Sequence, residues 1–249
     1  MSFHVIIPAR WASSRLPGKM LADLGGLPMV VRVAQRAKQT LAKSITIATD
    51  DERIWAVAKA HNVDCVMTHA KHPTGTDRLA QAAELLALGP DEIVVNVQGD
   101  EPLIDPALIE MVAQSLQTDT AADIATCASP IAHSVGMANP NIVKVVCDTK
   151  GHALYFSRAP IPYTRDLGDT NAARNSAPML HHIGLYAYRV RFLRAFPQLT
   201  QGLLEAAESL EQLRALEHGF KIRVNVIDQP SAGGVDTPED LLRVQQSFQ

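Results

Sequence analysis

The chain lacks both glycine-rich motifs that usually identify a nucleotide-binding loop. No G-x-G-x-x-G sequence follows any of its predicted strands, so a dinucleotide-binding fingerprint is absent. A Walker A loop is absent as well, because Ser13 stands where its first glycine would be and Met20 stands where Ser or Thr would follow the Gly-Lys pair. Any phosphate site in this chain must be built in another way.

Cysteines and long apolar runs are also scarce. Cys65, Cys127 and Cys147 are scattered and show neither C-x-x-C nor Cys/His ligand spacing, so we expect reduced core thiols. No apolar run has the length of a membrane span, and the first residues do not show the basic and apolar regions of a signal peptide. We therefore expect a cytoplasmic protein with no membrane partner.

Net charge is small. The chain has 23 Lys and Arg against 26 Asp and Glu, a net charge of -3, and so offers no broad basic field for a nucleic acid. Its 249 residues, 47% of them hydrophobic, are enough to bury the core of one large α/β domain. Since no repeat or low-complexity linker divides the chain, we expect one domain over residues 1–249 with no nucleic-acid partner.

Apolar strands alternate with helical periodicity over the first hundred residues. The pattern predicts strands at 5–7, 45–49, 64–67 and 93–97, with helices at 28–41, 51–61 and 76–88. This alternation is typical of a doubly wound α/β sheet.

The pattern becomes β-rich from about residue 123 to residue 190. Predicted strands lie at 124–128, 142–147, 153–156 and 183–188, and they indicate an antiparallel or mixed extension of the sheet. A polar segment at 164–176 fits a lid or a surface loop equally well. A helix at 203–216, a strand at 222–226 and a closing helix from Thr237 complete the prediction.

A basic loop follows the first strand. Arg10, Arg15 and Lys19 could neutralise a triphosphate by direct contact, an arrangement typical of nucleotidyltransferases. A solvated basic loop is the alternative. The position of the loop favours phosphate, because ligands of α/β sheets usually lie at the carboxyl ends of the strands.

Two acidic segments are candidates for a metal site. Asp100 follows the buried strand at 93–97 beside Gly99, where a carboxylate could hold a hard cation, although Gly-Asp is also an ordinary turn. Thr237 and the acids after it read as a helix start, but capping leaves Asp236 unexplained, so it could supply a second magnesium ligand.

A further helix start, at residues 72–78, has two interpretations. Thr74 and the acid after it form an unremarkable helix cap. Gly75 and Arg78 would also suit a contact to a nucleobase or ribose.

A set of motifs runs in order from Ile7 to Leu241: IPAR, SRLPGK, GTDR, VNVQGDEP, YFSR, HIGLYAYR, LEQLR and VDTPEDL. These motifs, spread over most of the chain, resemble those of one family, the 3-deoxy-manno-octulosonate cytidylyltransferases, which activate the acidic sugar Kdo. Similarity to the CMP-sialic acid synthetases is looser, because those carry a glycine-rich loop where this chain has residues 11–17.

The resemblance implies an α/β nucleotide-diphosphosugar transferase fold, a homodimer, and condensation of CTP with Kdo to CMP-Kdo and pyrophosphate for lipopolysaccharide biosynthesis. It implies nucleotide contacts from Ala9, Arg10, Ser13, Arg15, Lys19, Thr74, Arg78 and Gln98. Mg²⁺ would be held by Asp100 and Asp236, which form the catalytic set with Arg10 and Lys19. The sugar pocket would draw on Gln98, Arg158, His182, Tyr186, Glu211 and Gln212.

Plainer interpretations exist for several of these residues. Glu211 and Gln212 could lie on a solvated helix face, and Tyr186 could be a core aromatic. Adjacent strand residues point to opposite sides, so at most one of His181 and His182 should line a pocket; the motif favours His182.

Two other functions fit the same nucleotide half. The sugar could be 8-amino-Kdo or a nonulosonate. A non-catalytic CTP-binding regulator should lack the metal-binding acids or Lys19, and this chain has both.

Overall fold

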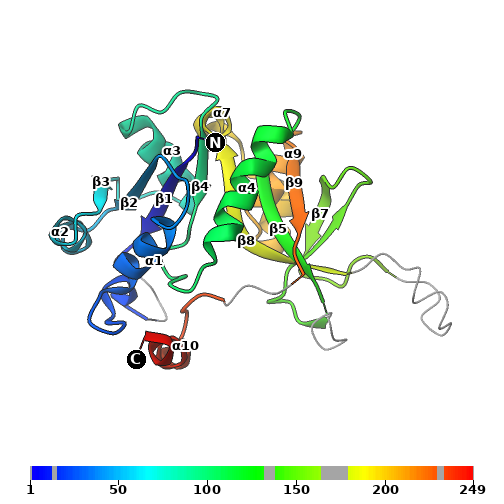
Figure 1. Cartoon of the computed structure of the whole chain (residues 1–249). Coiled ribbons are helices and arrows are strands. Elements are labelled where there is room, and N and C mark those ends of the chain that lie inside the picture. Colours follow the sequence, from blue (N-terminus) through cyan, green and yellow to red (C-terminus); the bar gives the residue numbers. More distant parts are fainter. Residues whose placement is uncertain (1, 13–15, 132–137, 164–178, 229–232, 249) are drawn as a thin grey trace.

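A nine-stranded mixed sheet forms the centre of the computed structural model, which describes residues 2–12, 16–131, 138–163, 179–228 and 233–248 (Figure 1). Seven strands follow one another in the order β3-β2-β1-β4-β8-β5-β9, while β6 pairs with β7 and β8. The strands are β1 (His4–Ala9), β2 (Ser44–Thr49), β3 (Asp64–Met67), β4 (Ile93–Asn96), β5 (Ile124–Pro130), β6 (Lys144–Cys147), β7 (Ala153–Ser157), β8 (Leu180–Arg189) and β9 (Ile222–Val226).

The first four strands are parallel, as the alternating pattern predicts. Strand β4 is buried at every position, which explains its continuous apolar run in the sequence. The β-rich region is not simply an extension at one side, because β8 inserts antiparallel between β4 and β5. Only β6 and β7 branch away from the main order of strands. The predicted doubly wound mixed sheet is therefore present, with a strand of the β-rich region at its centre.

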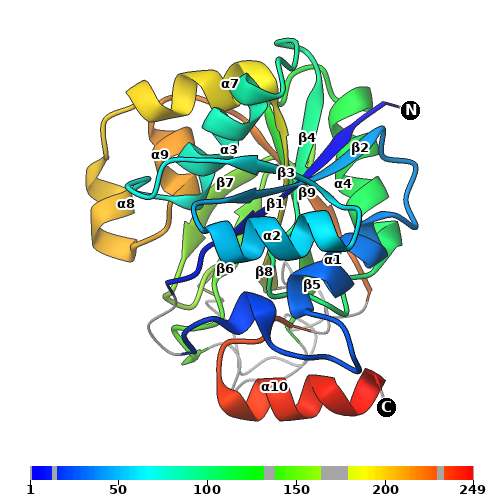
Figure 2. The same cartoon turned by 90° about the vertical axis from the view of Figure 1, so that its left-hand side faces the viewer.

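Helices cover both faces of the sheet. The helices α1 (Met29–Ala37), α2 (Glu52–Ala60) and α4 (Pro106–Thr118) pack into one hydrophobic cluster. The helices α3 (Gly75–Leu85), α7 (Val190–Ala195) and α9 (Gln212–Glu217) pack into a second cluster on the opposite face (Figure 2). Among the described residues, no helix is long and apolar enough to cross a membrane.

Three features of the helices differ from the sequence prediction, and the first is α7, which was not predicted. Helix α4 was not predicted, although Asp105 caps it by accepting a hydrogen bond from the Ala107 amide and Pro106 occupies its first position. The helix predicted at 203–216 is two helices, α8 (Leu203–Glu208) and α9. Ser209 separates them with a left-handed backbone, φ 51°, which ends α8 and turns the start of α9 inward.

The closing helix α10 (Pro238–Gln245) lies beside the carboxyl end of β1, at the opposite end of the molecule from the N-terminus (Figure 1). Val235 and Val244 are buried against Leu24 and Met29, which follow the first loop of the chain. This packing brings residue 236 to the same end of the sheet as the basic loop. The expected division of the chain, one domain over residues 1–249, stays a prediction.

Candidate active site

A cavity of about 490 Å³ opens at the carboxyl ends of β1 and β4. We call it the central cavity. It is lined by Pro8, Arg10, Ala12, Lys19, Met20, Pro73, Thr74, Gly75, Thr76, Asn96, Gln98, Tyr186, Tyr188, Glu211 and Asp236. Ligands of open α/β sheets bind at this edge, so the basic loop lies where the sequence predicts it.

One end of the central cavity holds a cluster of charges around Lys19, which is only 7% exposed. The Lys19 Nζ donates to Asp100 Oδ2 at 2.6 Å, to Asp236 Oδ1 at 3.1 Å and to the Val235 carbonyl at 2.9 Å. Burial lowers the pKa of Lys19, but hydrogen bonds and charges from Asp100 and then Asp236 outweigh burial and raise it. The ammonium group is therefore charged at neutral pH. We call these three side chains the cation cluster.

The backbone brings these distant segments together. The Val235 amide donates to the Asp100 carbonyl at 2.8 Å, which joins the segment before α10 to the turn after β4. Thr237 and Asp240 form a capping box that starts α10 immediately after Asp236. A side chain at Gly99 would come within 3.0 Å of the Met20 sulfur and the Pro8 carbonyl oxygen, so this glycine permits the turn after β4 to lie close to the end of β1.

The carboxylates of the cation cluster suit a magnesium ion. Both reach one cation, the Lys19 ammonium, so their oxygens converge on a common region. No group of three or more His, Cys, Asp and Glu side chains that could hold a metal occurs among the described residues. Two carboxylates are nevertheless a suitable set for Mg²⁺, which keeps several waters and usually completes its shell with substrate phosphates.

The described parts of the basic loop, residues 10–12 and 16–19, contact each other and α2. The Gly18 amide donates to the Trp11 carbonyl at 3.2 Å, and Gly18 has a left-handed backbone, φ 71°. A side chain there would come within 3.0 Å of the Trp11 ring. Trp11 also contacts the Arg53 guanidinium, whose carbon lies 3.3 Å from a ring centroid, and Asp51 holds that guanidinium at 2.7 Å.

The expected triphosphate contacts are only partly covered by the structure. Arg10 and Lys19 line the central cavity. Ser13 and Arg15 lie outside the described residues. Ala9 is the last residue of β1 and its side chain is buried in the core, which leaves its backbone as the group available to a nucleotide.

The start of α3 forms another wall. Thr74 and Gln98 line the central cavity, and Thr74 caps α3 through a capping box with Asp77. Arg78 lies differently from the expectation of a direct nucleotide contact. It has no exposed surface and donates to Asp50 Oδ2 at 2.9 Å and to Thr68, because the turn of α3 points it into the protein. Arg78 therefore stabilises the start of α3 through its buried hydrogen bonds to Asp50 and Thr68.

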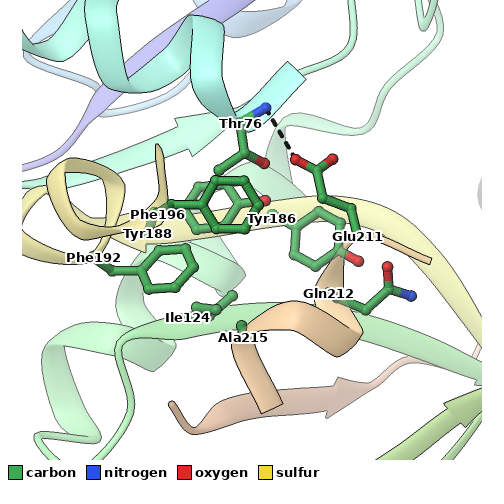
Figure 3. Close-up of a pocket in the computed structure, with 9 residues that line it drawn as sticks. All are labelled: Thr76, Ile124, Tyr186, Tyr188, Phe192, Phe196, Glu211, Gln212 and Ala215. Atoms are coloured by element: carbon green, nitrogen blue, oxygen red, sulfur yellow. Dashed lines mark hydrogen bonds between the residues drawn. The ribbon is translucent and has the colours of Figure 1, made fainter. Parts of the chain in front are cut away.

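Aromatic side chains line the other end of the central cavity. Tyr186 and Tyr188 project from one face of β8 and stack with their ring centroids 5.6 Å apart. Glu211 lies beside them and accepts a weak hydrogen bond from the Thr76 amide at 3.4 Å (Figure 3). These four residues also line a smaller recess that contains Gln212. We call this end, with its two tyrosines, Thr76 and Glu211, the aromatic end.

The tyrosines at this end remain neutral. Burial, followed by the charges of nearby groups, raises the pKa of Tyr186 well above its ordinary value, and burial together with Glu211 does the same for Tyr188. The Tyr188 hydroxyl interacts with Thr76 and Asn96, which offsets part of that rise. The aromatic end thus combines neutral hydroxyls with one carboxylate, groups that suit sugar hydroxyls.

Three expected sugar-binding residues do not line the central cavity: Gln212, which lines the smaller recess, His182 and Arg158. His182 is buried behind Tyr186, with ring centroids 5.3 Å apart, and its Nε2 lies 3.1 Å from Thr126 Oγ1. The Arg158 guanidinium donates to the carbonyls of Glu208, Pro140 and Ser209. A direct carboxylate contact by Arg158 would require it to exchange some of these bonds.

Sequence reasoning did not include two polar residues that line the central cavity, Thr76 and Asn96. Thr76 belongs to the helix start at residues 72–78, where capping explained the segment well. Asn96 stands between two valines in a buried strand. A polar residue in a strand buried on both faces was the available signal for Asn96, because such a residue needs a hydrogen-bond partner.

Comparison with known proteins agrees with the geometry. A family model described as cytidylyltransferase matches residues 4–222. The chain is similar to a solved structure of CMP:2-keto-3-deoxy-manno-octonic acid synthetase complexed with CTP, at 40% identity and a TM-score of 0.90, covering 99% of this chain and 98% of that one. A cytidylyltransferase from Leptospira borgpetersenii serovar Hardjo-bovis shares the fold, at 16% identity and a TM-score of 0.62, covering 98% and 84%.

Proposed function

This chain belongs to the cytidylyltransferase family, and we propose that it condenses CTP with Kdo to give CMP-Kdo and pyrophosphate. The synthetase at 40% identity is named for this sugar, 2-keto-3-deoxy-manno-octonic acid being another name for Kdo, and it was solved with CTP. The similarity over 99% of this chain confirms the expected family and the expected nucleotidyltransferase-type fold.

The observation that carries the proposal is that charged residues gather at one end of the central cavity and aromatic residues at the other. Lys19, Asp100 and Asp236 meet at one end, where they suit a triphosphate and its cation. Two stacked tyrosines and Glu211 line the other end, where they suit the rings and hydroxyls of a sugar. A single cavity therefore supports binding of both substrates of the proposed reaction next to each other.

We propose the following division of contacts. The nucleotide contacts come from Ala9, Arg10, Ser13, Arg15, Lys19, Thr74 and Gln98, with Arg78 supporting the start of α3. The sugar contacts come from Gln98, Arg158, Tyr186, Glu211 and Gln212, with His182 behind Tyr186.

The reaction needs no protein nucleophile. The anomeric hydroxyl of Kdo attacks the α-phosphorus of CTP in line, its oxygen forms the new phosphodiester bond, and pyrophosphate leaves. Lys19 and Arg10 stabilise the negative charge that develops on the phosphate oxygens. Asp100 and Asp236 would hold Mg²⁺, which when bound neutralises phosphate charge and lowers the pKa of the attacking hydroxyl. The hydroxyl proton passes to water, so the reaction requires no separate general base from the protein.

We propose two further properties that accompany this activity. The protein acts in the cytoplasm, and it forms a homodimer. Light scattering on the purified protein tests the second, because a mass near 27.0 kDa would identify a monomer.

The test is pyrophosphate release with CTP, Mg²⁺ and a panel of acidic sugars. We expect release with Kdo that depends on the sugar and forms CMP-Kdo. Preference for 8-amino-Kdo or a nonulosonate would keep the class of reaction and change the substrate. Binding of CTP without pyrophosphate release with any sugar would support a non-catalytic CTP-binding regulator instead.

A further inference from the structure

Asn96 has a buried polar atom that the protein itself does not satisfy. It is the last residue of β4 and is only 4% exposed. Its Oδ1 has no hydrogen-bond partner in the described part of the chain. A buried acceptor left unpaired is costly, and in native proteins such an atom usually has a partner in water or a bound ligand.

The position of Asn96 shows where that partner would lie. Asn96 lines the central cavity and pairs directly with Tyr186 across the β4–β8 ladder. Directly paired strand residues project to the same face, so the amide lies on the face that carries the stacked tyrosines. Its influence on the Tyr188 hydroxyl places it next to that ring as well. Asn96 therefore belongs to the wall of the aromatic end, not to the cation cluster.

The chemistry of this wall defines the ligand group. A carbonyl oxygen accepts hydrogen bonds and repels the oxygens of a phosphate, which excludes the triphosphate as its partner. Glu211 lines the same cavity, so the ligand must supply hydrogen-bond donors. A sugar with several hydroxyls supplies them without a charge.

Resting on the proposed function, we infer that Asn96 is a further sugar-binding and specificity-determining residue, whose Oδ1 accepts a hydrogen bond from a hydroxyl of the acidic sugar. Sugars that lack this hydroxyl would leave the acceptor unpaired. A site built around such an acceptor discriminates against the deoxy analogue more strongly than apolar contacts can. Asn96 would thus help the enzyme select among acidic sugars.

The experiment compares the wild type with Asn96→Ala and Asn96→Asp, using pyrophosphate release with CTP and Kdo. We expect Asn96→Ala to raise the KM for Kdo about three- to tenfold and to leave the KM for CTP unchanged, since one hydrogen bond to the sugar is lost. Asn96→Asp keeps an acceptor in place and should recover part of the loss. Asn225→Ala is the matched control, because Asn225 lies on β9, is not among the residues that line the central cavity, and donates to the Thr126 carbonyl.

Deoxy analogues of Kdo, each lacking one hydroxyl, identify the group bound. The analogue that lacks the partner of Asn96 should weaken binding to the wild type and have little further effect on Asn96→Ala, a coupling that a purely structural role would not produce. Thermal unfolding and CTP titration establish that each variant is folded. If Asn96→Ala is poorly folded, the analogue series is measured on Asn96→Leu, which is close to asparagine in shape and has no acceptor.

Each outcome separates this inference from the proposed function. An active wild type with an unchanged KM for Kdo in Asn96→Ala would overturn the inference alone. A rise confined to the KM for CTP would do so too, and would identify the cytosine amino group as the partner. A wild type that releases no pyrophosphate with Kdo would overturn the proposed function and, with it, the inference.

Discussion

The cation cluster, of which Lys19 and Asp236 line the central cavity, and the aromatic end of the same cavity are held together by different forces. Lys19, Asp100 and Asp236 come from three segments far apart in the chain, and hydrogen bonds between charged groups join them. Tyr186 and Tyr188 come from one strand, and stacking with Phe192 of α7 extends them into the core. The charged end is therefore sensitive to the loss of a single charge, and the aromatic end to changes in packing.

This difference affects what each end can do in a reaction. Fixed charges stabilise a transition state whose charge is concentrated on phosphate oxygens. A neutral wall with a few hydrogen-bond acceptors orients a sugar but does not stabilise the charge of the transition state. We expect mutations in the cation cluster to change kcat, and mutations at the aromatic end to change mainly the KM for the sugar.

The largest effect is expected from Asp100→Asn. Removing this carboxylate weakens the proposed magnesium site and one partner of Lys19, so turnover should fall by about a hundredfold or more. Pyrophosphate release at saturating Mg²⁺ measures it. Asp236→Asn should act in the same direction. Near-wild-type turnover in folded Asp100→Asn would show that the cation cluster does not determine kcat.

Lys19→Ala should cost about 2–4 kcal/mol of transition-state stabilisation, since it removes a buried cation from the phosphate end. The ratio kcat/KM for CTP measures this loss, and Lys19→Arg should restore only part of it. Removal of Lys19 also leaves Asp100 and Asp236 without their shared partner, so binding of Mg²⁺ should be measured alongside. Unchanged kinetics in Lys19→Ala would mean that the loop is only a solvated turn.

The two ends also differ in how far sequence could predict them. Lys19, Asp100 and Asp236 follow strands or precede a helix, where charged residues point to ligand chemistry, and the structure brings all three together. Asn96 has only the weaker signal of a polar residue in a buried strand, and its place beside Tyr186 depends on the register of β4 against β8. Thr76 is uncharged, and the helix start already explained its segment. The insertion of β8 between β4 and β5 is a long-range pairing, which local periodicity does not contain. Helix α4 had a local signal in Asp105 and Pro106, and that one could have been predicted.

Acid should destabilise the aromatic end through His182, which lies behind it. Burial, together with the neighbouring charge of His181, lowers the pKa of His182 to about 3. Between pH 3 and its unfolded value near 6.5 the unfolded chain binds a proton that the folded chain does not, so the free energy of unfolding falls as the pH falls.

In His182→Gln, the free energy of unfolding should fall by a few kcal/mol less than in the wild type as the pH is lowered over the same range. Urea unfolding at a series of pH values measures it, and the other titrating groups cancel in the comparison with the wild type. Parallel profiles for the two proteins would mean that His182 is accessible to protons in the folded state, as a pocket-lining histidine would be.

Arg158→Ala tests whether the carboxylate clamp belongs to the sugar end. We expect a rise of about tenfold in the KM for Kdo with the KM for CTP unchanged, because a lost clamp affects one substrate. Calorimetry of Kdo binding to the enzyme with CTP and Mg²⁺ gives the direct measurement. Since Arg158 also bonds the Glu208 and Ser209 carbonyls before α9, a loss of thermal stability equal to that of Glu208→Gln would identify a structural role instead.

The smallest effect is expected at the junction between the basic loop and α2. Arg53 is exposed, but its guanidinium covers the ring of Trp11, whose carbonyl accepts a hydrogen bond from the Gly18 amide. Arg53→Ala removes this cover, so the loop should be held less firmly and the KM for CTP should rise about two- to fivefold. Arg53→Lys keeps the charge without the planar stacking, so its KM for CTP should lie between those of the wild type and Arg53→Ala.

Lys59→Ala is the matched control, because it removes another cation over a tryptophan on the same helix, away from the loop. Trp55→Phe leaves Trp11 as the sole tryptophan, so the response of its fluorescence to CTP reports the loop directly. An Arg53→Ala enzyme with the fluorescence response and KM of the wild type would show that the loop is positioned without α2.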